Sequence, residues 1–173
     1  MKRVLFLFLL LVGLIFLDLQ LGSLLSPFLE NGIQPNYHIF LVVLVALTSG
    51  EYDWALFYAC LLIGAFWDIY ILNVLGLNII LLPIFTLLAS GVYKIKRFSF
   101  WRFCFLSVIF IFLFETSHFG VAQFLGWMSY SWDYFTVKIL APTLVVNLVV
   151  GVLLYPLFKR FLQRNRHLIV TNV

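Results

Sequence analysis

The sequence predicts an all-α polytopic membrane protein. Three observations support this prediction: the composition, the mean hydropathy and the division of the chain into long apolar runs. Of the 173 residues, 64% are hydrophobic and only 10% are charged, whereas a soluble domain is about half apolar with about a quarter of its residues charged. The mean hydropathy is +1.11. The apolar residues form long runs separated by short links. At about 20 residues per crossing, the length allows roughly six transmembrane helices and excludes a separate soluble domain.

We expect a single integral membrane domain, residues 1–173, folded as a compact bundle. The six expected spans cover approximately residues 4–25, 37–50, 54–72, 75–93, 103–125 and 139–158.

The first span follows two basic residues, an arrangement that is also typical of a secretory signal sequence. Its apolar run resumes after Asp18, and no small-residue cleavage site precedes Ser26. We therefore expect an uncleaved helix. A loop with turn residues then leads to the second run, which is short enough to be a buried or re-entrant segment.

The third and fourth spans form a tight helical hairpin across Asn73 and Val74. A basic loop precedes the fifth span, and an aromatic link, residues 126–134, precedes the last one. With the N-terminus in the cytoplasm, Lys138 is the only one of 11 Lys and Arg residues outside. This asymmetry follows the positive-inside rule, so both termini are expected to be cytoplasmic.

The basic residues lie at the ends of apolar runs and not on an amphipathic face, which argues against nucleic-acid binding. Cys60 and Cys104 both lie inside apolar runs without a CxxC motif, so neither a disulfide nor a zinc site is indicated. Phosphate-binding loops, nucleophile elbows and histidine clusters are absent from the sequence. We expect a protein that is not an enzyme and has no cofactor.

Three acidic residues lie within apolar runs, namely Asp18, Asp68 and Glu115. An ionisable group at membrane depth costs several kcal/mol unless it is paired, protonated or close to a span end. Asp18 and Asp68 lie toward the outer ends of their spans, where solvation or pairing costs less. Glu115 and His118 share one helical face, so a buried structural pair is favoured over a proton relay.

Small and polar residues also recur at helical spacing in two spans. In the last span they are Thr143, Asn147, Gly151 and Tyr155; in the fourth they are Asn78, Thr86 and Ser90. Such stripes are typical of close helix packing and interhelical hydrogen bonds in membranes. They are expected to face neighbouring helices of this chain or of a partner.

Residues 64–68 (GAFWD) and 75–78 (LGLN) resemble the rod shape-determining protein MreD family. That family is similar in length and hydropathy, and it shows a glycine and an aspartate near the end of the third apolar segment and a Leu-Gly pair opening the fourth. Pro35 before the second span, and Thr143 with Asn147 ahead of a basic tail, are also similar. Glu115 and His118 are not assigned to the family pattern.

The resemblance implies a scaffold of the cell-elongation machinery in the bacterial inner (plasma) membrane. It implies association with the bitopic protein MreC and, through it, with MreB, RodA and a class B penicillin-binding protein. The MreD family is also similar in helix organisation to the substrate-binding S components of energy-coupling-factor vitamin transporters. An S component remains the alternative function, with a pocket built from Trp127, Tyr130, Trp132 and Asp133.

The scaffold hypothesis assigns structural roles to the polar and small residues. Gly64, Asp68 and Gly76 shape the third-to-fourth hairpin, and Asn147 ties the last helix to that hairpin. A lateral groove of the bundle receives the transmembrane helix of the partner. The basic tail binds the anionic lipids of the cytoplasmic leaflet.

Overall fold

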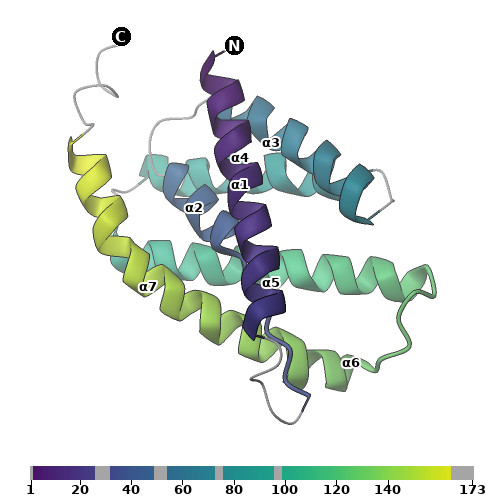
Figure 1. Cartoon of the computed structure of the whole chain (residues 1–173). Helices are drawn as coiled ribbons and strands as arrows, with labels where there is room; N and C mark the ends of the chain where they lie inside the picture. The colour runs from purple at the N-terminus through teal and green to yellow at the C-terminus, as the bar shows by residue number, and fades with distance from the viewer. Residues whose placement is uncertain (1, 26–31, 49–53, 73–75, 96–98, 165–173) are drawn as a thin grey trace.

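The computed structural model describes residues 2–25, 32–48, 54–72, 76–95 and 99–164. This part of the chain is helical and contains no β-strand. Its elements are α1 (Lys2–Leu25), α2 (Ile39–Leu47), α3 (Trp54–Trp67), the π-helix η2 (Asp68–Leu72), α4 (Leu77–Ile95), α5 (Phe100–Phe124), α6 (Trp132–Tyr134), the π-helix η3 (Phe135–Leu140) and α7 (Ala141–Arg164) (Figure 1). The expected Asn73–Val74 turn, residues 96–98 of the basic loop and the end of the tail lie outside the described residues.

Four of the described helical stretches are long and apolar enough to cross a membrane. They are Lys2–Leu24, Trp54–Ile71, Phe100–Phe124 and Trp132–Arg160, and Leu77–Val92 is a shorter apolar helix. The chain is therefore a helical, membrane-embedded protein, and the count of six crossings stays a prediction.

The second expected span is the element that differs most from its prediction. Residues 37–50 were expected to form a helix; α2 covers Ile39–Leu47, residues 37–38 are not helical, and residues 49–50 lie outside the described part of the chain. Nine residues rise by about 13.5 Å, less than half of the hydrocarbon thickness of about 30 Å. Residues 33–38, which precede α2, are not helical. The physical reason is that side chains of other helices pair with the backbone of this stretch, as described below.

The short helix α2 lies at the centre of the bundle and contacts α1, α4, α5 and α7. Around it, α3 packs against α1 and α4, while α5 packs against α7 (Figure 1). Six of the nine residues of α2 are buried. A helix that is apolar on all sides needs such a central position, because every face must meet another apolar surface.

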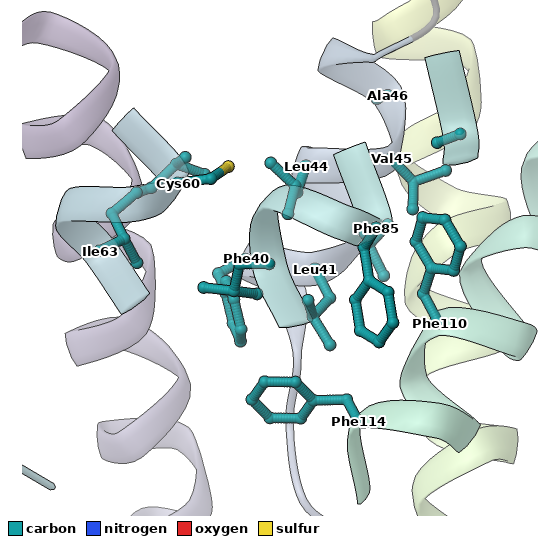
Figure 2. Close-up of a cluster of buried hydrophobic side chains, with 14 of the residues drawn as sticks. Phe40, Leu41, Leu44, Val45, Ala46, Cys60, Ile63, Phe85, Phe110 and Phe114 are labelled. Atoms are coloured by element: carbon teal, nitrogen blue, oxygen red, sulfur yellow. The ribbon is translucent and has the colours of Figure 1, made fainter. Parts of the chain in front are cut away.

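Aromatic and aliphatic side chains from four helices form the core around α2 (Figure 2). Phe40 of α2 contacts Trp67 of α3 and Phe114 of α5, with ring centroids 5.1 and 5.7 Å apart. Phe85 of α4 stacks on Phe110 of α5 at 4.9 Å with an angle of 15° between the rings. The contacts of Phe40 hold α2 against α3 and α5, and the stacked pair joins α4 to α5.

Helices α3 and α4 approach each other most closely at Gly64. A Cβ atom added there would lie 2.5 Å from the carbonyl oxygen of Asn78 and 2.6 Å from the backbone nitrogen of Ile79. No side chain fits without moving one helix. Gly76, just before α4, has φ +116°, a conformation that residues with a side chain rarely adopt.

Candidate functional site

Non-helical backbone enters the bundle at residues 36–38, and side chains of α7 satisfy its polar groups. The backbone N–H of Asn36 donates to Thr143 Oγ1 at 2.9 Å, and Asn147 Nδ2 donates to the carbonyl of Asn36 at 2.7 Å. The N–H of His38 donates to Asn147 Oδ1 at 2.7 Å. Non-helical backbone at membrane depth requires such protein partners, since lipid supplies none. The polar stripe of α7 therefore replaces the hydrogen bonds that a helix would have made.

The carboxylate of Asp18, on α1, binds the N-terminus of α2. Its Oδ1 accepts the N–H of Ile39 at 2.9 Å, and its Oδ2 accepts the N–H of Phe40 at 3.0 Å. The first N–H groups of a helix have no partner within the helix, and the helix dipole favours a negative charge there. Asp18 is 4% exposed, and among the described residues this buried acid is paired with backbone donors and not with Lys or Arg.

Glu115, on α5, joins the same cluster through two side chains of the non-helical stretch. Its Oε1 accepts a hydrogen bond from Asn36 Nδ2 at 2.8 Å and lies 2.5 Å from His38 Nε2. Asp18, Asn36, His38, Glu115, Thr143 and Asn147 form one connected set, which we call the α2 entry cluster. The cluster links α1, α5 and α7 to the start of α2.

A second aspartate repeats this arrangement at the start of α4. Asp68 is fully buried, and its carboxylate accepts the backbone N–H groups of Gly76, Asn78 and Ile79. Its Oδ1 also accepts Asn78 Nδ2 at 2.9 Å. Asp68 begins η2, so the π-helical turn brings the carboxylate back to the next helix along the chain. The structure thus places Asp68 between α3 and α4, with its carboxylate at the N-terminus of α4.

His118 belongs to this second group, and the neighbouring atoms define its tautomer. Asn78 Nδ2 already donates one hydrogen to Asp68, so its other hydrogen points to His118 Nε2 at 3.2 Å. His118 Nδ1 lies 2.7 Å from the carbonyl oxygen of Phe114, which can only accept. In this arrangement His118 is a neutral imidazole with its proton on Nδ1.

For two expected contacts in this region, the hydrogen-bond partners differ from those predicted from the sequence. Glu115 and His118 do not bond to each other, because each side chain reaches a different group: Glu115 the entry cluster and His118 Asn78. Asn147 does not tie α7 to the third-to-fourth hairpin, because both ends of its amide bind the backbone before α2 and its own helix. The hairpin is held by Asp68 and Asn78 instead.

The remaining sequence candidates lie close to these groups. Pro35 is buried within the non-helical stretch, directly before Asn36. Gly151 is buried on α7, where an added Cβ would meet Phe103 at 3.6 Å and Val42 at 3.8 Å, an ordinary contact. Thr86 and Ser90 are buried on α4 and bond to carbonyls of their own helix. The predicted polar stripes thus face inward.

Sequence reasoning missed Asn36 and His38 and left Asp18 out of the candidate site. Asn36 was assigned to an exposed loop, and it is exposed and non-helical, but its side chain also reaches Glu115. The available signal was the run Pro35–His38, three polar or aromatic residues after a proline, directly before an apolar run too short to span. Asp18 was recognised as a costly acid, but its partner is backbone, which no residue pattern identifies.

The aromatic link lies on the surface. Trp127, Tyr130 and Trp132 are 55%, 49% and 48% exposed, as interfacial anchors would be, and Asp133 is also exposed. Trp127 also lines a cavity, which is described below and which the other three residues do not line. Among the described residues, no three His, Cys, Asp or Glu side chains are arranged to hold a metal ion.

Comparison with known proteins identifies the family of this helical bundle. The model of the family described as rod shape-determining protein MreD matches residues 2–165. The chain belongs to the MreD family. A relative, the cell shape-determining protein MreD of Streptococcus pneumoniae (strain ATCC BAA-255 / R6), is 26% identical over 144 residues, which cover 81% of this chain and 85% of the relative.

Membership in the MreD family gives the chain a role in cell-shape determination, and the family is one of structural proteins. The matched residues include Asp18, Asp68 and the whole α2 entry cluster. No solved structure matches the chain significantly. The predicted fold similarity of this MreD-family chain to energy-coupling-factor S components therefore stays a prediction.

Proposed function

We propose that this MreD-family chain is a non-enzymatic scaffold of the cell-elongation machinery, which binds an MreC-like bitopic protein in the bacterial plasma membrane. Through that partner it acts with MreB, RodA and a class B penicillin-binding protein in organising peptidoglycan synthesis. The inward-facing polar groups support an architectural role, since Asp18, Asp68 and Asn147 all bind backbone groups.

A heptad pattern on the outer face of α1 carries this proposal. Phe6, Leu9, Gly13, Phe16 and Gln20 follow one another at alternating spacings of three and four residues, and all five are exposed. This spacing is that of a coiled-coil seam, which receives a second helix at a crossing angle of about +20°. We call these five residues the α1 seam. No described helix of the chain covers it fully, so a partner helix has access.

The composition of the α1 seam fits a transmembrane helix better than lipid alone. A Cβ atom added at Gly13 would have no neighbour within 4 Å, so a partner backbone can approach closely there. Gln20 is exposed one heptad later, and a polar residue on a helix face in a membrane favours a hydrogen-bonding partner and fixes the register. Both features favour one bitopic helix lying along α1.

The topology that goes with this proposal places both termini in the cytoplasm. Lys138 precedes α7 on the outer side, and Lys159 and Arg160 near the end of α7 are exposed where the cytoplasmic leaflet is expected. Anionic lipids attract such residues by about 1 kcal/mol each. The seam then runs from the cytoplasmic end of α1 to its outer end.

The test uses two glycine substitutions of equal size. Gly13→Leu fills the gap in the seam, whereas Gly91→Leu adds the same side chain to an exposed position of α4 that also has no neighbour within 4 Å. Leucine favours a helix over glycine by about 1 kcal/mol, so neither change is expected to unfold the bundle. The tagged proteins are purified from native membranes in mild detergent, and copurifying proteins are quantified by mass spectrometry.

We expect the wild type and Gly91→Leu to recover MreC with wall-synthesis enzymes, and Gly13→Leu to recover at least tenfold less MreC. Equal recovery with both variants would exclude the α1 seam as the contact. Recovery of a coupling transmembrane subunit with two ATPases, in place of MreC, would overturn the scaffold proposal and favour the S-component alternative.

A further inference from the structure

A cavity of about 480 Å³ lies beside the α2 entry cluster. Its walls come from the C-terminal part of α1, residues 36–38, the end of α3 with η2, the second half of α5, and η3. Pockets for small molecules are commonly about 300–1,000 Å³, mostly apolar, with a few polar groups placed on one side. This cavity has that composition, with Asp18, His38 and Glu115 among its polar lining residues.

One oxygen of Glu115 is free to bind a ligand in this cavity. Glu115 is 6% exposed, and both of its described hydrogen bonds go to Oε1. Oε2 has no partner among the described residues. Four side-chain atoms of the described residues are fully buried and lack a hydrogen-bond partner: His38 Nδ1, Asn78 Oδ1, Ser107 Oγ and Thr116 Oγ1. Glu115 Oε2 is not among them, so this unpaired oxygen is accessible. Oε2 is therefore an open acceptor on a buried residue that lines the cavity.

The charges around the cavity favour a cation. Asp18 and Glu115 contribute two carboxyl groups, and both oxygens of Asp18 accept hydrogen bonds, as in the ionised form. The described lining residues include neither Lys nor Arg. His118 is neutral in this arrangement, which leaves His38 as the one lining group that can offset a carboxylate. An anionic ligand would meet like charge without a fixed cation to pair with.

The remaining lining residues suit the apolar body of such a ligand. Phe119 and Phe135 stack at 4.0 Å with an angle of 5° between their rings, and Trp127 and Phe114 also line the cavity. Aromatic faces attract ammonium groups, most strongly where water is excluded. A carboxylate and several aromatic rings around one space therefore select an organic cation over a neutral molecule of the same shape.

We propose that this cavity binds a primary ammonium group attached to a compact apolar body, with the ammonium donating to Glu115 Oε2 and the body lying among Phe119, Trp127 and Phe135. This ligand site goes beyond the scaffold function and does not depend on it. The ammonium group itself is available both from the headgroup of an aminophospholipid in the surrounding bilayer and from a free amine.

The test measures thermal stabilisation of the full chain in detergent by phenethylammonium, with 2-phenylethanol and phenylacetate as neutral and anionic controls of similar size. We expect saturable stabilisation by phenethylammonium and at least tenfold weaker apparent affinity for both controls. Glu115→Gln keeps an acceptor for Asn36 and His38 but removes the charge, and it is expected to lose the preference for the ammonium.

Two further variants separate ligand binding from folding. Ala122→Phe adds a ring to a cavity wall without touching the hydrogen bonds of the α2 entry cluster, and it should abolish binding. Phe112→Ala changes an exposed residue of α5 that does not line the cavity, and it should bind like the wild type. Equal stabilisation by the alcohol, or unchanged binding in both Glu115→Gln and Ala122→Phe, would overturn the proposal.

The source of the ammonium is then identified by native mass spectrometry of protein released from bilayers of phosphatidylethanolamine or of phosphatidylglycerol. Retained phosphatidylethanolamine that phenethylammonium displaces would support a lipid ligand. Binding of the free amine without retained lipid would support a soluble one. Retention of phosphatidylglycerol that the amine displaces would contradict the predicted selectivity for cations.

Discussion

The carboxylate of Asp18 lies at the N-terminus of α2, with Oδ2 3.0 Å from the backbone nitrogen of Phe40. Its other oxygen accepts the N–H of Ile39 at 2.9 Å. These donors have no partner within α2, and the hydrocarbon core contains no water to replace one. One side chain of α1 thus allows a nine-residue helix to begin inside the bundle.

Replacing Asp18 by Ala is expected to lower the free energy of unfolding by about 1–3 kcal/mol, because it leaves two buried N–H groups without acceptors. Asp18→Asn keeps one carbonyl oxygen and should lie between Ala and the wild type. The measurement is unfolding by SDS in mixed micelles. Leu17→Ala, a change at the exposed neighbouring residue, is the control. Equal losses in Leu17→Ala and Asp18→Ala would contradict the capping role.

Gly64→Ala is expected to destabilise the protein by about 1–3 kcal/mol, since the new Cβ would overlap the backbone of α4 at Asn78. Gly91→Ala, on α4, adds the same methyl group to open space and should be neutral or stabilising. Thermal midpoints of the two purified variants give the comparison. A Gly64→Ala midpoint at or above that of Gly91→Ala would show that the helices do not approach as described.

Asn147→Leu is expected to reduce both stability and recovery of the MreC-like partner, because it removes the acceptor of the His38 N–H and the donor to the Asn36 carbonyl. Thr143→Val removes only the acceptor of the Asn36 N–H and should have a smaller effect. Leu153→Ala, at an exposed position of α7, is the control. If Leu153→Ala and Asn147→Leu weaken assembly equally, Asn147 has no special role.

Cysteine labelling tests the predicted topology. Ser131→Cys, before α6, should react with a membrane-impermeant maleimide in intact cells, whereas Arg160→Cys should react only after permeabilisation. Both positions are exposed. The natural cysteines give little background, because Cys60 is 0% and Cys104 is 9% exposed. Labelling of Arg160→Cys in intact cells would place the end of α7 outside.

The long helices were predictable from the sequence because each is coded locally. The expected spans 4–25, 54–72, 75–93, 103–125 and 139–158 all overlap described helices, since a run of about 20 apolar residues must satisfy its backbone as a helix in lipid. The last helix begins earlier than expected, because α6 and η3 continue directly into α7. The aromatic link was taken as a connection, although its end is already helical.

The α2 entry cluster was not predictable in the same way, because its partners are distant in the sequence. The sequence predicted that the polar stripe with Thr143 and Asn147 faces a neighbouring element, but these side chains bind the backbone of Asn36 and His38, and a residue pattern does not show which backbone groups need a partner. Helical spacing placed Glu115 and His118 on one face of a helix. It contains no information about which residue of another segment each of them contacts, Asn36 for Glu115 and Asn78 for His118. Such pairings depend on tertiary packing.

The non-helical entry to α2 has a consequence for the biogenesis of the protein. As the chain leaves the ribosome, Asp18 has already been made when α2 emerges. Asn147, in contrast, is made 109 residues after His38. Until α7 is inserted, the backbone at Asn36 and His38 lacks its final acceptors and cannot enter the lipid phase without a large penalty. This stretch must therefore wait at the aqueous boundary or in the insertion machinery, and its placement becomes the last step of assembly.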